Sequence, residues 1–363
     1  MTEPFAPAFG NRPSRFVDRE REIAAFAKGL QGPGGHPNRA LLFTGQRGMG
    51  KTALLLELAA QAEQFGFVAA KATADDGLLD ELLEVIQANG MKRVPKGKPL
   101  KGFNVGALGF SVGLTFNDHT QNSYGFRVKL GLLCDALAER GLGVVLLVDE
   151  VTASSPELRK LVTTYQELVG EGKNIAIAMA GLPTAVSRLL NDQVLTFLNR
   201  ASKFRLEPIP VHEIVSLYVK EFRSLGKSMS AEDFQRAAEA TLGYPYLLQL
   251  IGYYLLDFAG EAESIDAPIV ELAIANSRKA LASTVFEPSL APLSARDVEF
   301  LRAMSVDTGP SAVDAIAQRL GYSRDSVQQT RSRLLAAKVI ASPRRGELAF
   351  ELPYLAEYLR GEL

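Results

Sequence analysis

The sequence predicts an α/β fold, with a parallel-sheet core, an all-helical region and a small C-terminal module of helices and a hairpin. Three patterns predict this order. Short apolar runs alternate with helix-forming stretches over residues 1–206, helical periodicity alone follows over residues 207–285, and helices with two short terminal strands occupy residues 286–363. Alternating strands and helices favour a parallel sheet that binds its ligand at the carboxyl ends of the strands.

A glycine-rich loop opens the predicted core. It matches the pattern GxxxxGK[ST] in full, with Gly45, Gln46, Arg47, Gly48, Met49, Gly50, Lys51 and Thr52. The loop lies between an apolar run, 40–43, and a helix-forming stretch, 53–60, which is the context that a phosphate-binding loop requires. Its glycines let backbone N–H groups face phosphate oxygens, and the helix N-terminus adds partial positive charge. Lys51 then reaches the β- and γ-phosphates and Thr52 offers a hydroxyl to Mg²⁺, so the loop predicts binding of ATP or ADP with Mg²⁺.

A second strand is expected to complete the site. The continuous apolar run 144–148 is typical of a strand buried on both faces, and it ends in Asp149 and Glu150. Asp149 is predicted to hold Mg²⁺, and Glu150 to polarise the attacking water. The Asp149–Glu150 pair therefore predicts hydrolysis of ATP as well as binding, with Glu150 and Lys51 as catalytic residues.

Further strands and helices follow from the same patterns. Short apolar runs predict strands at 67–71, 174–180 and 203–206, and the helical region predicts helices over 211–225, from Ser230 onward and over 246–258. Between the second and third strands lies an insertion, about 92–118, that is basic and then alternates like a hairpin. It is either an arm that faces DNA or a partner, or a surface loop with solubilising lysines.

The last region predicts a winged helix-turn-helix domain. Two prolines in 286–294 mark its boundary, and Ser294 is expected to cap a helix that reaches about Met304. Helices over 311–320 and from Ser323 to Ala337 follow, then strands at 339–342 and 347–350.

Positive charge collects in this module, although the whole chain is balanced with 40 Lys and Arg against 41 Asp and Glu. Residues 311–346 carry a net charge of about +5. The candidate DNA contacts are Arg324, Arg331 and Arg333 on the third helix and Arg344 and Arg345 at the hairpin, with Ser326, Gln328, Gln329, Thr330 and Ser332 beside them. Double-stranded DNA is the predicted partner, and the alternative is a protein-docking module whose basic face is merely solvated.

Two segments add a resemblance to a known family. The chain resembles the AAA+ and STAND branches of the P-loop ATPases (the ASCE group), especially ORC-like and archaeal-type ATPases that end in a winged helix. The segment 16–22, FVDRERE, is similar to the one that opens such modules, and 243–248 is similar to their G-x-P segment. The resemblance implies that Val17 and Arg19 lie near the adenine and that Pro245 contacts the base from a helical lid.

The family pattern also implies an arginine finger, Arg200, acting in trans within an oligomer. Each feature has a plainer structural alternative: Asp18 as a helix N-cap, Gly243 and Pro245 as the end and start of two helices, and Arg200 as an exposed helix-end residue. The family's sensor positions differ here, with Ala180 to Pro183 after the fourth strand and Pro245 in place of an arginine, which implies slow turnover.

The sequence is consistent with two functions. One is an ATPase that couples nucleotide state to DNA binding through the winged helix, and the other is a STAND-like signalling switch whose winged helix docks protein. The length of 363 residues allows two or three domains, and a single cysteine, Cys134, excludes a disulfide framework. No apolar run approaches the ~20 residues of a membrane span, so we expect a cytoplasmic protein without a membrane partner.

Overall fold

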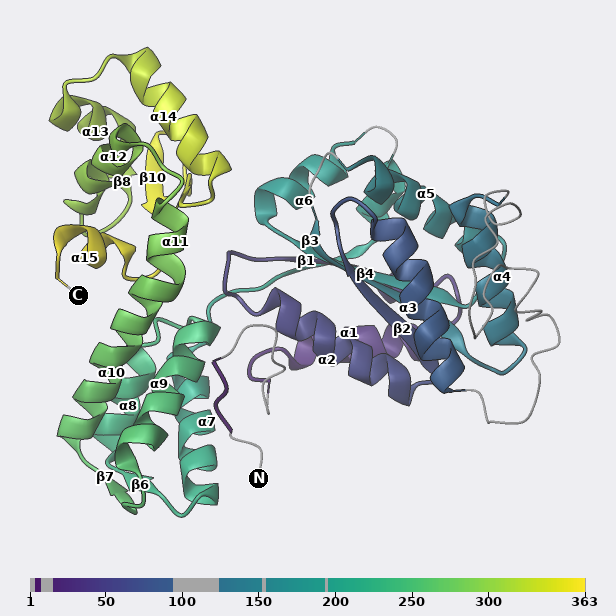
Figure 1. Ribbon diagram of the computed structural model, residues 1–363, viewed down its shortest axis with the longest axis horizontal. Coiled ribbons are helices and arrows are strands. Elements are labelled where there is room, and N and C mark those ends of the chain that lie inside the picture. Colours follow the sequence, from purple (N-terminus) through teal and green to yellow (C-terminus); the bar gives the residue numbers. More distant parts are fainter. Residues whose placement is uncertain (1–3, 8–15, 94–123, 152–154, 193–194, 363) are drawn as a thin grey trace, which may run out of the picture. The chain divides into compact units, whose positions relative to one another are not determined.

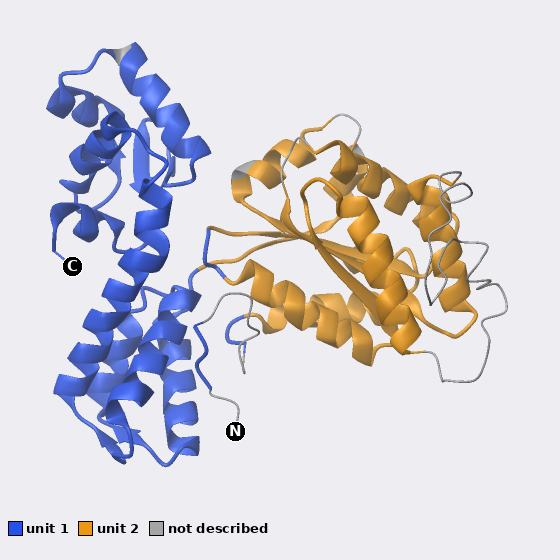
Figure 2. Ribbon diagram, in the orientation of Figure 1, with its two compact units in different colours: residues 1–18, 47–49, 208–363 blue, residues 19–46, 50–207 orange. Residues whose placement is uncertain are grey.

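The computed structural model describes residues 4–7, 16–93, 124–151, 155–192 and 195–362, without the side chains of Thr184, Thr196 and Arg324 (Figure 1). The chain divides into two compact units (Figure 2). Unit 1 holds residues 1–18, 47–49 and 208–363, and unit 2 holds residues 19–46 and 50–207. The insertion predicted at about 92–118 lies outside the described residues from 94 onward.

Unit 2 is built on a five-stranded parallel sheet, in the order β2-β3-β4-β1-β5. Its strands are β1 (Ala40–Thr44), β2 (Phe67–Thr73), β3 (Gly143–Val151), β4 (Ile175–Gly181) and β5 (Ser202–Arg205). All seven residues of β4 are buried, which explains why this strand is a continuous apolar run rather than an alternating one. The predicted α/β class with a parallel-sheet core and the predicted strands of this sheet are confirmed, whereas the winged helix stays a prediction.

Helices cover both faces of this sheet. They are α1 (Glu20–Gln31), α2 (Lys51–Gln64), α3 (Leu78–Lys92), α4 (Phe126–Ala138), α5 (Pro156–Gly170) and α6 (Pro183–Leu190), with short 3-10 turns at η1 (Pro37–Arg39) and η3 (Thr196–Arg200). One hydrophobic cluster joins α3, α4 and α5 to the sheet face that carries Val144, Leu146 and Val148. No residue of α2 belongs to that cluster, although α2 contacts β2, β3 and β4, so α2 covers the opposite face.

The start of α1 differs from the sequence expectation. The helix begins at Glu20, and Arg19 rather than Asp18 is its N-cap residue, with no side-chain cap. Asp18 precedes the N-cap residue and has φ of 55°, so the plainer alternative, with Asp18 as the N-cap, is wrong by one residue.

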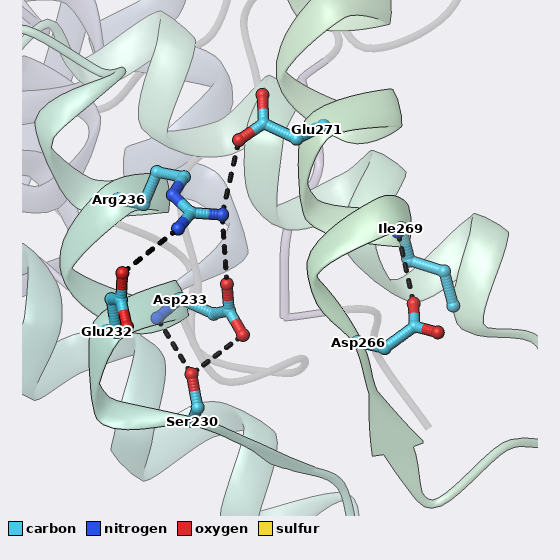
Figure 3. A network of polar contacts seen from close by, with 7 residues as sticks. All are labelled: Ser230, Glu232, Asp233, Arg236, Asp266, Ile269 and Glu271. Atoms are coloured by element: carbon cyan, nitrogen blue, oxygen red, sulfur yellow. Dashed lines mark hydrogen bonds and ion pairs between the residues drawn. The ribbon is translucent and has the colours of Figure 1, made fainter.

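Unit 1 contains the helical region. Its elements are α7 (Val211–Ser224), β6 (Ser228–Met229), α8 (Ala231–Glu239), α9 (Pro245–Ala259), β7 (Ser264–Ile265) and α10 (Ala267–Leu281). Ser230 caps α8 by accepting the Asp233 N–H, and Arg236 joins Asp233 to Glu271 of α10 (Figure 3). Phe5 from the N-terminal segment fills the aromatic centre of this region, against Tyr218 and Phe222.

The helix continues past Phe286 and across Pro288, and it ends at Leu290, so the chain leaves the helix within the predicted segment 286–294, in a turn that contains Pro292. A π-helical turn, η4 (Ala282–Phe286), leads from α10 into α11 (Glu287–Leu290), and Pro288 lies in the first turn of α11. A proline in a first turn loses an N–H that the helix does not need, and a π turn relaxes the regular hydrogen-bond ladder before it.

The C-terminal region contains α12 (Ala295–Ser305), β8 (Ser311–Ala312), α13 (Val313–Leu320), α14 (Arg324–Ala336), β9 (Ile340–Ala341), β10 (Glu347–Phe350) and α15 (Leu355–Arg360). Its strands form an antiparallel sheet in the order β8-β10-β9. Ser294 and Asp297 form the predicted cap of α12 as a full capping box. Tyr354 links the region to α8, because its hydroxyl donates to the Ala240 carbonyl at 2.7 Å.

No helix among the described residues combines the length and the apolar character that a membrane crossing demands.

Candidate nucleotide site

The glycine-rich loop connects β1 to α2 through two left-handed glycines. Gly48 has φ of 79° and Gly50, the N-cap residue of α2, has φ of 78°. No side chain caps the N-terminus of α2. The backbone N–H groups of its first turn can therefore donate to an anion such as a phosphate. The Lys51 ammonium donates to the loop's own carbonyls, to Gly45 at 2.9 Å and to Gln46 at 2.7 Å.

Gly48 also has a packing requirement within unit 1. A Cβ on this residue would lie 1.8 Å from the Tyr244 hydroxyl oxygen, so no other residue fits without a shift. Burial raises the pKa of Tyr244 to about 12, with a smaller opposing effect from Arg47. The glycine is therefore needed for both its dihedral angle and its missing side chain. The sequence motif identified this glycine but gave no signal for Tyr244.

The two carboxylates at the end of β3 differ sharply in environment. Asp149 is only 4% exposed, and its Oδ1 accepts the Glu150 N–H at 2.9 Å. Glu150 is exposed and has φ of 51°, which is left-handed for a residue that is not glycine. The pairing of β3 with β4 shifts register between Val148 and Val151, so a bulge turns Glu150 out of the regular strand. Such strain, about 1–2 kcal/mol, often persists at functional positions.

The topology brings the loop and the two acids to one edge. In a parallel sheet the carboxyl ends of all strands meet there, and only β4 separates β1 from β3. Ligands of open α/β sheets bind at this edge, between the ends of the strands. The loop residues Lys51 and Thr52 and the acids Asp149 and Glu150 are thus placed around one region, as the sequence predicts.

A lysine that the motifs did not identify joins this site. Lys71 of β2 places its Nζ 3.7 Å from Asp149 Oδ2, with 28% of the lysine side chain exposed and 5% of the aspartate side chain. The pairing of Thr73 with Asp149 in the sheet sets this neighbourhood. Sequence alone could not find it, because the contact depends on the register of two strands that lie far apart in the chain.

A hard cation suits the chemistry of these groups. No cluster of three metal-ligating side chains exists among the residues that the structure describes. Mg²⁺ at nucleotide sites instead uses one or two protein oxygens together with phosphates and water. The buried Asp149 carboxylate at the end of β3 supplies oxygens of the kind that Mg²⁺ prefers, and Lys71 already lies beside one of them.

The remaining sequence-predicted nucleotide contacts are distributed over both units. Arg19 in unit 2 is 5% exposed and donates from Nη2 to the Glu207 carbonyl at 2.9 Å. Arg200, also in unit 2, is exposed at the end of η3. In unit 1, Val17 packs against the helical core and Pro245 is the first residue of α9. The lid-side contacts of Val17 and Pro245 and the finger role of Arg200 stay predictions.

The five arginines predicted to contact DNA occupy different environments in the C-terminal region. Arg344 and Arg345 are exposed at the turn between β9 and β10. Arg331 donates to Gln328 at 3.3 Å and to Ser342 at 3.5 Å, while the side chain of Arg324 lies outside what the structure describes.

Arg333 points instead toward α12, where its Nη2 lies 2.7 Å from Asp297 Oδ1. Gln328, Gln329 and Ser332 are exposed on α14, but Thr330 is only 1% exposed, so the expectation of a DNA contact from Thr330 is wrong.

Fold and site define a P-loop ATPase that binds nucleotide. The chain belongs to the family described as "ATPase domain predominantly from Archaea", which matches residues 16–251. Residues 283–359 match a family described as "Domain of unknown function (DUF8462)". No curated protein matches the chain.

Solved structures show the same fold over the whole chain. The Walker-type ATPase PABY2304 of Pyrococcus abyssi has a TM-score of 0.65 at 17% identity, covering 95% of this chain and 96% of its own. The ORC2 protein of Aeropyrum pernix, in ADPNP–ADP complexes, has a TM-score of 0.64 at 14% identity, covering 98% and 95%. Cdc6p of Pyrobaculum aerophilum has a TM-score of 0.52 at 17% identity, covering 98% and 95%. The expected resemblance to archaeal-type and ORC-like ATPases is thereby confirmed for the fold.

Proposed function

We propose that this chain hydrolyses ATP slowly with Mg²⁺ and couples its nucleotide state to the binding of double-stranded DNA through its C-terminal region. The observation that carries the hydrolytic part is the strained Glu150 beside the buried Asp149. Both lie at the carboxyl ends of the strands, where the phosphate loop follows β1. A mere binding site needs no exposed carboxylate held out of its strand in this way.

Each residue has a distinct role in this proposal. The uncapped N-terminus of α2 and Lys51 hold the β- and γ-phosphates, and Lys51 exchanges its loop carbonyl partners for phosphate oxygens. Thr52 and Asp149 hold Mg²⁺, which supplies charge neutralisation at the phosphates when it is bound. Glu150 orients the attacking water and accepts its proton. Arg200 would stabilise the transferred charge in a neighbouring copy, so this part of the proposal needs a self-oligomer.

The DNA-binding part rests on the C-terminal region. We propose that this region acts as a winged helix, with α14 as the helix that contacts DNA and the β9–β10 turn as the wing. Arg344 and Arg345 are exposed at that turn, and Arg331 lies between α14 and Ser342 of the wing. These three arginines would form a cationic surface of the kind that binds phosphates.

A second candidate function has its own support. Two arginines of the region are already paired with acids, Arg333 with Asp297 and Arg319 with Asp307, and these pairs reduce the charge available to DNA. This observation favours a STAND-like switch whose C-terminal region docks protein.

One experiment separates the two candidates. Fluorescence anisotropy of the full chain on random duplex DNA is measured with ADP and with a non-hydrolysable ATP analogue, over a range of salt concentrations. Affinity that falls steeply with salt and changes with the nucleotide supports the DNA-directed ATPase, since phosphate neutralisation releases counterions. No binding in either nucleotide state would leave the protein-docking switch as the function.

A further inference from the structure

We propose that Lys71 is a positioning residue that competes with Mg²⁺ for the Asp149 carboxylate and so sets the Mg²⁺ requirement of the nucleotide site. The inference rests on the nucleotide function proposed above and concerns a residue that lies outside both sequence motifs. It is carried by the geometry of two adjacent strands within unit 2.

Lys71 and Asp149 lie on the same face of the sheet. In the pairing of β2 with β3, Lys71 is opposite Leu147 and Thr73 is opposite Asp149, so alternation along each strand puts all four side chains on one face. That face is the one covered by α2, because Val144, Leu146 and Val148 belong to the cluster on the other side. The lysine stem therefore runs along the strand toward the site at the start of α2, and its ammonium ends 3.7 Å from Asp149 Oδ2.

The character of this contact suits displacement. A hydrogen bond between an ammonium and a carboxylate usually has a length near 2.8 Å. The 3.7 Å between Lys71 Nζ and Asp149 Oδ2 is longer, so the two groups form an ion pair without a normal hydrogen bond. Asp149 Oδ1 is held by the Glu150 N–H at 2.9 Å, whereas Oδ2 is the oxygen that faces Lys71. A metal ion that binds Asp149 must share the carboxylate with the ammonium or move it aside.

Electrostatics give the direction of the effect. A neighbouring cation weakens the negative potential that attracts a second cation, and this effect is strong beside a carboxylate that is only 5% exposed. Lys71 thus makes the site a poor binder of Mg²⁺ in the absence of nucleotide. A nucleotide that brings its own phosphate ligands overcomes this competition, so the metal enters together with the nucleotide.

The test compares Lys71→Met, Lys71→Arg and a matched control, Lys173→Met. Lys173 belongs to the same unit and also pairs with an aspartate, Asp135, at 2.6 Å. It lies just before the start of β4, away from the carboxyl ends of the strands where the nucleotide site lies. The measurement is the Mg²⁺ concentration that gives half-maximal binding of a fluorescent non-hydrolysable ATP analogue. Electron paramagnetic resonance of Mn²⁺ provides a direct metal readout, and the affinity for the analogue in EDTA is measured in parallel.

Lys71→Met should lower the Mg²⁺ midpoint on the order of tenfold, as expected when a cation is removed beside a carboxylate. Lys71→Arg keeps the charge and adds a forked donor, so its midpoint should equal or exceed the wild-type value. Lys173→Met should leave the midpoint unchanged. An unchanged midpoint in Lys71→Met, or a lower one in Lys71→Arg, would overturn the inference.

A purely structural role of Lys71 would weaken binding of the analogue in EDTA and lower the thermal stability of both Lys71 variants. Their Mg²⁺ midpoints would then stay equal to each other, and this result too would overturn the inference. Failure of the nucleotide site itself has a separate signature, because the wild-type chain would then bind no analogue at any Mg²⁺ concentration.

Discussion

Arg333→Gln tests whether a basic residue of α14 serves the fold or the DNA. The guanidinium donates twice to Asp297 Oδ1, from Nε at 3.1 Å and from Nη2 at 2.7 Å. Asp297 Oδ2 also accepts from the Ser294 N–H at 3.1 Å, within the capping box of α12. The pair therefore ties the N-terminus of α12 to the last turn of α14.

The magnitude follows from the exposure of the two partners. A hydrogen bond to a charged group contributes roughly 1.5–3 kcal/mol, whereas an exposed ion pair contributes about 0.2–1 kcal/mol. Arg333 is half exposed and Asp297 is 5% exposed, so solvent screens the pair from one side only. We expect Arg333→Gln to cost about 1 kcal/mol in the local stability of α12 and α14. Asp297→Asn should cost about 2 kcal/mol, because it also weakens the cap.

Amide hydrogen exchange of the full chain, followed by mass spectrometry, measures this local cost. About 1 kcal/mol corresponds to roughly fivefold faster exchange in α12 and α14 if these helices open locally. The double variant should show a coupling of about 1 kcal/mol between the two substitutions. Unchanged exchange in Arg333→Gln, together with weaker DNA binding, would refute this reasoning and assign the side chain to DNA.

The same pair predicts a pH dependence. Burial raises the pKa of Asp297, but hydrogen bonds from Arg333 and Ser294 outweigh it and hold the pKa below its usual range. A carboxyl group whose pKa is lowered by folding adds stability above its unfolded pKa of about 3.9, and this stability is lost as the pH falls through the folded value. The difference in exchange between wild type and Arg333→Gln should therefore be full at neutral pH and shrink below about pH 4. A constant difference down to strongly acidic pH would contradict the assignment.

Three further predictions concern other parts of the chain. Lys51→Ala should weaken ATP binding roughly 100-fold or more by calorimetry, since it removes a charge-assisted contact to phosphate, and normal affinity would exclude the site. Glu150→Gln should keep ATP binding but slow single-turnover hydrolysis roughly 100-fold or more, and undiminished turnover would remove Glu150 from its role. Tyr354→Phe loses the 2.7 Å hydrogen bond to the Ala240 carbonyl and should cost about 1 kcal/mol, seen as faster exchange at the end of α8 and in α15. Equal exchange in both chains would show that this hydroxyl does not hold the two segments together.

The strands and caps could be predicted because their signals are local. β3 and β4 are buried on both faces and therefore appear as continuous apolar runs, and Ser230, Ser294 and Ser323 each cap the helix that follows them. The phosphate loop is likewise a contiguous motif. The residues that specify these elements are neighbours in the chain, so the local sequence is sufficient to predict them.

The contacts that could not be predicted join residues that are distant in sequence. Lys71 meets Asp149 only through the register of β2 and β3, and Arg333 meets Asp297 only after α12 packs near α14. Glu150 adopts a positive φ that its residue type does not favour, so no local pattern signals it. The helix continues across Pro288 after a π turn, and this turn has no comparable sequence signature.

These distant contacts change how the nucleotide site is understood. Lys51 is satisfied by two loop carbonyls and Asp149 by Lys71 and the Glu150 N–H, so the site has internal partners for the very groups that would hold the ligand. Binding then exchanges one set of contacts for another, and its net free energy is smaller than the sum of the new contacts. A nucleotide without metal replaces only the partners of Lys51. Mg²⁺ must in addition share Asp149 with Lys71 or displace it, so this internal contact opposes the metal, and the phosphate ligands of a nucleotide offset that cost when the two bind together.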